Sequence, residues 1–308
     1  MNRQKNYWNI AEIVDELCQL RTLARETPHP NYNPPKPPSR KLLTKVLDGL
    51  TACLFPNRLG PAELSDEGIN HFVGHTLDVA LRELYEEAIR ELRVLNHIEL
   101  GHESALMIQA QRIIRDFAAQ LPTVRKLLDT DIQAAFEGDP AARTVDEVLI
   151  CYPGVRAIIN HRLAHVLYKL GLPLLARMIA EIAHADTGID IHPGARIGSR
   201  FFIDHGTGVV IGETAVIGDG VRLYQAVTLG AKRFPTDEQG NLIKGNDRHP
   251  IIEDDVVIYA GATILGRITI GRNSVIGGNV WLTRSVPPNS NITQAQVRSE
   301  AFVQGSGI

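Results

Sequence analysis

The segment VVIGETAVIGDGVRLYQAVTL, residues 209–229, repeats one pattern every six residues. Two apolar residues separated by one position recur throughout it, beginning with Val209 and Ile211. In both directions from this segment the same pattern continues, from Ile189 to Leu282, and it is interrupted twice. A fixed period of this length is typical of a solenoid built from short repeats.

Residues two apart in a strand point to the same face, so each pair marks a short strand with both side chains turned inward. Gly, Asp and Asn stand between the pairs, where the chain must turn, as in Gly218-Asp219-Gly220. Hairpins and crossover helices do not fit such short spacings. With three strands to a triangular coil, the segment predicts roughly four coils of a parallel β-helix, and the chain as a whole an α+β fold.

The repeat is broken at two places, and irregularity that survives in a regular fold marks candidate functional sites. The turn Asp204-His205-Gly206-Thr207-Gly208 is longer than the others, so His205 is expected at an outer corner of the prism rather than inside it. The polar loop 231–249 leaves the coil and ends in Arg248-His249. We therefore expect the chemistry near these two breaks.

Counting strands places the two breaks relative to each other. Strands three apart stack, so Asp190 on the first strand lies one coil, ~4.8 Å, from Val210 on the fourth, just past the His205 turn. His205 precedes the fourth strand and His249 the eighth, which are different edges of the prism. Within one chain the two histidines should diverge. They would converge across two prisms of a cyclic trimer, unless the loop folds back.

The residues before the coil read as helices. Helical patterns cover 7–26, 40–55, 70–95, 100–120, 123–137, 154–170 and 174–185. We divide the chain into a helical domain at 1–186 with a proline-rich connector at 27–39, the coil at 187–288, and a tail at 289–308. The helical domain should cover one open end of the coil, since such stacks need capping.

Composition argues against several classes of protein. The net charge of −3 lacks the basic excess of a nucleic-acid binder. Cys18, Cys53 and Cys151 show neither metal-ligand spacing nor an even disulfide framework, so we expect reduced thiols and a cytoplasmic protein. No apolar run approaches a membrane span, and acidic residues interrupt any signal-peptide core, so no membrane partner is expected.

A set of segments carries a resemblance to a known family. They are Asp190-Ile191-His192-Pro193, Ile203-Asp204-His205-Gly206-Thr207-Gly208, Gly212-Glu213-Thr214-Ala215, Val227-Thr228-Leu229-Gly230 and Arg248-His249-Pro250, with Asp139-Pro140 upstream. Over roughly 139 to 288 the chain resembles the bacterial serine O-acetyltransferases of the hexapeptide-repeat acyltransferase superfamily. The resemblance implies a left-handed coil. It also implies transfer of acetyl from acetyl-CoA to the hydroxyl of L-serine, which gives O-acetyl-L-serine and CoA at the first step of cysteine biosynthesis.

The resemblance also implies roles for the catalytic residues. His205 would be the base that takes the proton of the serine hydroxyl, and Asp190 would fix its tautomer and stabilise the imidazolium. His249 would come from the neighbouring chain and complete the pocket. The nucleophile is the hydroxyl of the substrate, so no serine of the enzyme is required.

A small amino acid needs charged partners at both ends. By resemblance, Asp139 and Asp204 would face the ammonium group of serine, while Arg248 with His249 would hold its carboxylate. Asp139 also reads as an ordinary turn residue before a proline, and Arg248 as a solvated loop charge.

Acetyl-CoA would lie in the groove between neighbouring prisms and needs no metal. The matching positions are small residues that expose main-chain donors, although their glycines equally serve the turns: Gly230, Ala231, Ala260, Gly261, Gly277 and Gly278. Cysteine, isosteric with serine apart from its thiol, would compete for the pocket. The subunits would form a trimer or a dimer of trimers. The terminal Ile308 would dock into O-acetylserine sulfhydrylase.

Departures from the family pattern keep alternatives open. Loop 231–249 is long, Gly230-Ala231 replaces a Gly-Gly pair, and no Gly-x-Pro-Ala segment follows Pro287-Pro288, which bears on the adenosine side of CoA. A different acceptor, homoserine or a sugar, is one alternative. A metal hydratase that uses three histidines, His192, His205 and His249, is another. The third is a non-catalytic scaffold that binds the sulfhydrylase.

Overall fold

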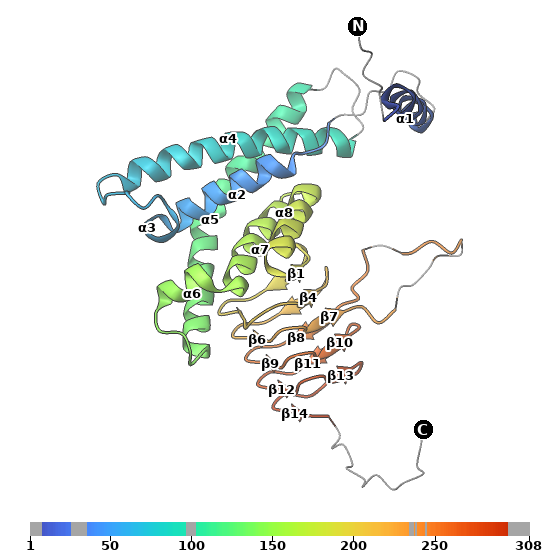
Figure 1. Ribbon diagram of the computed structural model, residues 1–308. Coiled ribbons are helices and arrows are strands. Elements are labelled where there is room, and N and C mark those ends of the chain that lie inside the picture. Colours follow the sequence, from blue (N-terminus) through green and yellow to red (C-terminus); the bar gives the residue numbers. More distant parts are fainter. Residues whose placement is uncertain are drawn as a thin grey trace. The chain divides into compact units, whose positions relative to one another are not determined.

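The computed structural model describes residues 8–25, 36–96, 103–233, 237, 239–243 and 245–294. Contacts divide the chain into two compact units, one up to Pro37 and one from Pro38 onward. Within the described ranges the second unit contains helices followed by a coil of short parallel strands (Figure 1). None of the described helices is long and apolar enough to cross a membrane.

The helices follow the sequence prediction except at two points. Their bounds are α1 Ile10–Arg25, α2 Arg40–Leu54, α3 Pro56–Leu59, α4 Ile69–Asn96, α5 Glu103–Gly138, α6 Val145–Cys151, α7 Pro153–Lys169 and α8 Pro173–Thr187. The short helices α3 and α6 were not predicted. The predicted division between 100–120 and 123–137 is wrong, because α5 runs through Pro122 without ending. Its buried stripe continues on both sides of the proline, from Phe117 to Leu128, and this packing outweighs the lost hydrogen bond.

Two buried carboxylates of α4 accept hydrogen bonds from the first turns of neighbouring helices. Glu87 accepts a hydrogen bond from the backbone N–H of Ser39 at the start of α2. Glu91 accepts from Leu174 and Leu175 at the start of α8, at 2.7 and 2.8 Å. Because the N-terminus of a helix presents free N–H groups and a partial positive charge, each carboxylate is stabilised there. Burial nevertheless raises the pKa of Glu91 above its ordinary value.

The coil is a triangular prism of short parallel strands. Their bounds are β1 Asp190–Ile191, β2 Arg196–Ile197, β3 Phe202–Ile203, β4 Val210–Ile211, β5 Val216–Ile217, β6 Arg222–Leu223, β7 Thr228–Gly230, β8 Ile251–Ile252, β9 Val257–Ile258, β10 Thr263–Leu265, β11 Thr269–Ile270, β12 Val275–Ile276, β13 Trp281–Leu282 and β14 Asn291–Ile292. Strands three apart pair, except that β14 pairs with β12, which gives three sheets that we name A (β1-β4-β7-β10-β13), B (β2-β5-β8-β11) and C (β3-β6-β9-β12-β14). This arrangement confirms the predicted parallel β-helix.

The repeat also places its side chains as predicted. Inward residues such as Val209, Ala215 and Val221 are fully buried, and Asp190 pairs with Val210 one coil away. Strand β14 lies beyond residue 288, so the coil extends further than the predicted boundary. The physical reason is that Ile292 continues the inward column above Ile276, although its spacing departs from six.

Helices α7 and α8 cover the end of the coil next to β1, as the capping argument predicted (Figure 1). A buried ion pair joins the two parts. The guanidinium of Arg162 on α7 meets the carboxylate of Asp131 on α5 at 2.6 and 2.8 Å and also donates to the carbonyls of Ile197 and Gly198. The same carboxylate accepts from the N–H of Phe201 at 2.9 Å. One buried pair therefore fixes the first coil to two helices.

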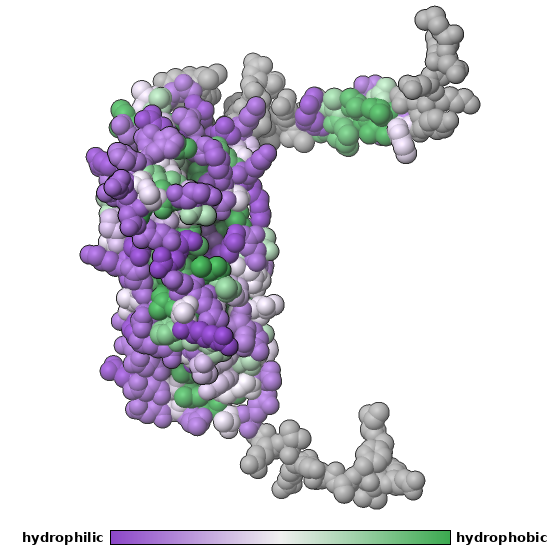
Figure 2. Space-filling view, turned by 60° about the vertical axis from the view of Figure 1, so that its left-hand side comes forward, coloured by the Kyte–Doolittle hydropathy of each residue, from purple (hydrophilic) through white to green (hydrophobic). Residues whose placement is uncertain are grey.

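Helix α1 carries an apolar stripe on its surface, visible as the contiguous green face in Figure 2. The stripe consists of exposed side chains at helical spacing: Ile10, Ile13, Val14, Leu17 and Leu20. This matches the amphipathic helix predicted there.

Candidate active site

The first group of candidate residues gathers where sheet C turns into sheet A, and we name it the His205 group. It contains Asp139, Tyr152, Asp204, His205 and Arg222. The last residue of α5, Gly138, packs against the ring of Phe202, and an added Cβ there would lie 3.1 Å from it. This contact brings Asp139, the next residue, to the corner at which β3 ends.

Hydrogen bonds fix both carboxylates of the His205 group. Asp139 accepts from the hydroxyl of Tyr152 and from the N–H of Ala141, so it is a turn residue as well as a member of the site. The bond from Tyr152 is the main cause that lowers the pKa of Asp139, and the charges of Arg222 and His205 add to it. The same bond raises the pKa of Tyr152 to about 12. Asp204 accepts from Arg222 at 3.0 Å.

His205 stands at the outer corner that the longer turn predicted, with 70% of its side chain exposed. Its backbone is in the left-handed region, at φ 60°. Its Nδ1 lies 3.8 Å from Asp204. Asp190 lies on the outer side of β1, and one of its carboxylate oxygens is 3.9 Å from Arg177 of α8.

The second group lies where sheet A turns into sheet B, and we name it the Arg248 group. It contains Glu213, Thr214, Arg248 and His249. Arg248 donates to Glu213 at 2.6 Å, and the hydroxyl of Thr214 accepts from the backbone N–H of both Arg248 and His249. Burial alone would raise the pKa of Glu213, but the bond from Arg248 and the charge of His192 lower it. The guanidinium is thus held in place before any ligand arrives.

His249 is 6% exposed, and its ring packs closely against Gly212, where an added Cβ would lie 2.0 Å from it. Its Nδ1 accepts from the backbone N–H of Thr214 at 3.1 Å. In the neutral ring the proton is therefore on Nε2, which is left as a donor. Burial, and then the charge of Arg248, lower the pKa of His249 to about 4.

This lowered pKa makes stability depend on pH. An unfolded histidine has a pKa near ~6.5, so between that value and about 4 the unfolded chain binds a proton that His249 in the folded chain does not. The free energy of unfolding should therefore fall as the pH drops through this range. In His249→Asn, whose amide oxygen can still accept from Thr214, the decline should be shallower by up to roughly 1 kcal/mol per pH unit. Urea denaturation at three pH values measures it.

Other groups titrate in the same range, so only the difference between variant and parent is informative. His161 is buried and its pKa is also lowered, but it is retained in both proteins. The matched control is His71→Asn on the exposed surface of α4, which should leave the slope unchanged. Equal slopes for His249→Asn and the parent would show that the folded ring carries a proton.

The two groups lie at the two opposite edges of sheet A and do not meet within one protomer. This agrees with the predicted divergence of His205 and His249, because one precedes β4 and the other precedes β8. Their electrostatic characters differ. The His205 group has two carboxylates, one of them paired with Arg222, and an exposed imidazole. The Arg248 group has one guanidinium paired with Glu213 and a neutral N–H donor.

Comparisons with known proteins decide the family. Residues 249–284 match the family described as bacterial transferase hexapeptide (six repeats). A relative from Synechococcus elongatus, "Serine acetyltransferase, plasmid", is 57% identical over 307 residues, which cover 98% of this chain and 95% of the relative. The chain belongs to the serine acetyltransferase family. It is accordingly an acyltransferase that acetylates serine, with acetyl-CoA as the general cosubstrate of such enzymes.

Solved structures of serine acetyltransferases share the fold. Isoform 3 from Entamoeba histolytica, determined in complex with cysteine, is 33% identical, has a TM-score of 0.70, and is covered over 96% of both chains. The enzyme from Neisseria gonorrhoeae in complex with serine is 29% identical with a TM-score of 0.53, over 82% of this chain and 95% of that chain. The helical half is thus shared along with the coil.

The positions expected to contact acetyl-CoA also fall on the edges of sheet A. Gly230 is the last residue of β7 and Ala231 follows it, at the edge of the Arg248 group. The other four lie after β9 and β12, at the edge of the His205 group: Ala260, Gly261, Gly277 and Gly278. Gly261 has φ 73°, and an added Cβ would lie 2.2 Å from Asn279, so this glycine also serves the turn. Ile308, which was predicted to dock into O-acetylserine sulfhydrylase, lies outside the described residues.

The three histidines of the hydratase alternative do not form a metal-binding group among the described residues of one protomer. A different trio, Glu181, His184 and Asp190, has ligand atoms within 4.8 Å of one another. Arg177 approaches both of its carboxylates, at 2.6 and 3.9 Å. Its positive charge opposes a cation at that point.

Sequence reasoning missed residues that hold the predicted ones. Glu213 and Thr214 belong to one of the segments that carry the family resemblance, but no role was predicted for them. Their distance along the sequence from Arg248 did not indicate a contact. Arg222 was accessible to the same strand counting that placed Asp190, because it pairs with Phe202 one coil below. Tyr152 had no signal, since α6 was not predicted.

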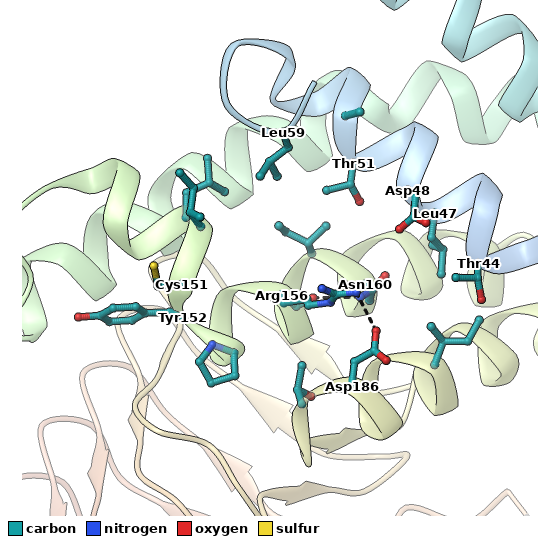
Figure 3. A pocket seen from close by; sticks show the side chains of 17 residues that line it. Thr44, Leu47, Asp48, Thr51, Leu59, Cys151, Tyr152, Arg156, Asn160 and Asp186 are labelled. Atoms are coloured by element: carbon teal, nitrogen blue, oxygen red, sulfur yellow. Dashed lines mark hydrogen bonds and ion pairs between the residues drawn. The ribbon is translucent and has the colours of Figure 1, made fainter. Parts of the chain in front are cut away.

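A cavity of about 540 Å³ opens between α2, α6, α7 and α8. Figure 3 shows Arg156 of α7 paired with Asp186 of α8 on its wall, at 2.8 Å. Tyr152 borders the cavity but directs its hydroxyl away from it, toward Asp139. The cavity contains none of the sequence-predicted site residues.

Proposed function

We propose that each serine pocket combines the His205 group of one subunit with the Arg248 group of the next in a cyclic trimer. The observation that carries this proposal is that one edge of sheet A carries two carboxylates and an imidazole, while the other carries a guanidinium held by Glu213 and a buried N–H donor. A zwitterionic amino acid needs an acidic and a basic partner at the same time. A threefold arrangement of identical prisms brings one edge of sheet A against the other edge of its neighbour.

In this pocket His205 acts as the general base. Its Nδ1 faces Asp204, which leaves Nε2 for the proton of the serine hydroxyl. As that proton leaves, the hydroxyl oxygen attacks the thioester carbon of acetyl-CoA and forms a tetrahedral oxyanion. The C–S bond then breaks, and the thiolate of CoA takes the proton back from the imidazolium. No enzyme group is consumed, and O-acetylserine and CoA are released.

The charged residues hold the ends of serine. Asp139 and Asp204 receive the ammonium group, and Arg248 with the Nε2–H of His249 receives the carboxylate. Glu213 keeps the guanidinium aimed, so little ordering is needed on binding. Asp190 acts on His205 as a second carboxylate after its partly exposed contact with Arg177 is released.

Acetyl-CoA lies in the groove between the same two prisms, along the six small residues at the edges of sheet A. Cysteine differs from serine only in its thiol and would occupy the same pocket as an inhibitor, in line with the cysteine complex of the Entamoeba relative. We also infer a cytoplasmic enzyme, pairing of two trimers through the helical half, and docking of Ile308 into O-acetylserine sulfhydrylase.

Subunit complementation tests the shared pocket. His205→Ala and Arg248→Ala are each expected to be nearly inactive. When the two are co-expressed and mixed trimers are purified through two different tags, one of the three pockets in each mixed trimer would receive both intact groups, and activity should return to about a third of the parent's.

The control separates a shared pocket from simple contamination. Mixed trimers of His205→Ala with Asp204→Ala, two residues of the same group, should not recover activity, because no pocket receives an intact His205 group. No recovery in the first mixture would place the whole pocket within one protomer. Recovery in the control mixture would show that the His205 group is not supplied by a single subunit.

A further inference from the structure

Two tyrosines form a stacked pair on the surface of the coil. The rings of Tyr224 and Tyr259 are 4.8 Å apart between centroids and inclined by 11°. Tyr259 is 44% exposed, which is unusual for a large aromatic residue on a regular coil. Among the residues that the structure describes, neither phenolic hydroxyl makes a hydrogen bond. The pair therefore offers a flat apolar wall with two free polar ends.

The pair belongs to the same edge as the His205 group. Tyr224 follows β6 and Tyr259 follows β9, just as Asp204 follows β3, so the three residues form a column along the turn from sheet C into sheet A. Successive coils are about 4.8 Å apart, which places Tyr259 roughly 10 Å along the coil from Asp204. Tyr259 also immediately precedes Ala260-Gly261, two of the positions expected to contact acetyl-CoA.

Contacts of Arg222 and backbone hydrogen bonds fix the positions of the two tyrosines. Arg222 donates to Asp204 and places its guanidinium 4.8 Å from the centre of the Tyr224 ring. The backbone N–H groups of both tyrosines donate to the next coil, Tyr224 to Ile258 at 3.0 Å and Tyr259 to Ile276 at 2.8 Å. Because backbone and ring are both held, the wall is present before any ligand binds.

We propose that Tyr259, stacked on Tyr224, is a positioning residue that holds the pantetheine arm of acetyl-CoA against the edge of sheet A. The proposal rests on the function proposed above and names the part of the donor that this edge recognises. The arm is a thin, flexible chain with two amides, so it suits an apolar wall with free hydroxyls at its rim. In the function proposed above, the thioester of acetyl-CoA lies beside His205. Tyr259 is about two coils from Asp204, a distance at which it would meet the pantetheine arm rather than the adenine ring.

The test compares two acyl donors in the full-length enzyme. In Tyr259→Ala the KM for acetyl-CoA should rise about tenfold, with kcat within about twofold and the KM for serine unchanged, because the lost contact positions the donor alone. Acetyl-pantetheine, which lacks the nucleotide, should show the same rise. Tyr259→Phe keeps the stacked ring and should recover most of the loss, and the remainder measures the hydroxyl.

Controls keep the outcomes distinct. Ile251→Ala removes an outward side chain from β8 in sheet B, on another side of the prism, and should leave both KM values unchanged. An unchanged donor KM in Tyr259→Ala overturns the proposal, and so does a rise with acetyl-CoA but not with acetyl-pantetheine, which would assign Tyr259 to the nucleotide. Calorimetry measures the affinity of each variant for CoA without any turnover of serine. The role proposed for Tyr259 can therefore be tested even if the proposed serine pocket is wrong.

Discussion

Replacing His205 by Ala should lower kcat by a factor of about 10² to 10⁴ and leave the fold intact. General-base catalysis contributes on that order, and no other titratable group of the His205 group is an imidazole. The side chain is 70% exposed and supports no packing in the protomer, so its loss costs little stability. Thiol release from acetyl-CoA in the presence of serine measures the rate.

A matched variant shows that the effect belongs to this histidine. His71→Ala removes an exposed imidazole from α4, far along the chain from the coil, and should keep normal turnover. The thermal midpoint of both variants should stay within a few degrees of the parent. Turnover of His205→Ala within tenfold of the parent would remove His205 from the role of base.

Replacing Asp131 by Ala should cause the largest loss of stability of any single change discussed for this protein. The carboxylate is 1% exposed and neutralises Arg162, which is itself 5% exposed. Removing it leaves a buried guanidinium without its charge partner and the N–H of Phe201 without an acceptor, at a cost of about 3–5 kcal/mol. The shift of the urea midpoint, at fixed subunit concentration, measures the loss.

The double variant distinguishes an unpaired charge from lost packing. In Asp131→Ala/Arg162→Met no buried charge remains, so the protein should be more stable than Asp131→Ala alone. Asp78→Ala breaks an exposed ion pair on α4 and should leave the urea midpoint nearly unchanged. If the double variant is no more stable than the single one, the buried charge is not what destabilises Asp131→Ala.

The position of this pair links stability to the candidate site. Asp131 and Arg162 fix the first coil to α5 and α7, and the C-terminal end of α5 carries Asp139 to the His205 group. A change that loosens this joint should therefore weaken serine binding as well as the fold. The site is built on the junction of the two halves rather than on the coil alone.

Periodicity was sufficient to predict the coil from the sequence. A strict six-residue repeat leaves one way to bury every apolar pair, and strand counting then fixes which residues stack, as Asp190 and Val210 show. The same counting separates His205 from His249, because the edge of a prism depends only on strand number. The exposed corner at His205 followed from the turn length, since extra residues cannot enter a close-packed prism.

Only the tertiary structure decided which side chains form hydrogen bonds and ion pairs with one another. Asp190 lies 3.9 Å from Arg177 of α8. Tyr152 reaches Asp139 from the junction of α6 and α7, and the sequence pattern did not reveal α6. Likewise Pro122 predicted a helix end that packing overrode. The repeat is a local property of the sequence, so it can be recognised from one segment. These contacts join segments that are far apart in the sequence. The direction of each side chain in them depends on how the segments pack, which no single segment determines.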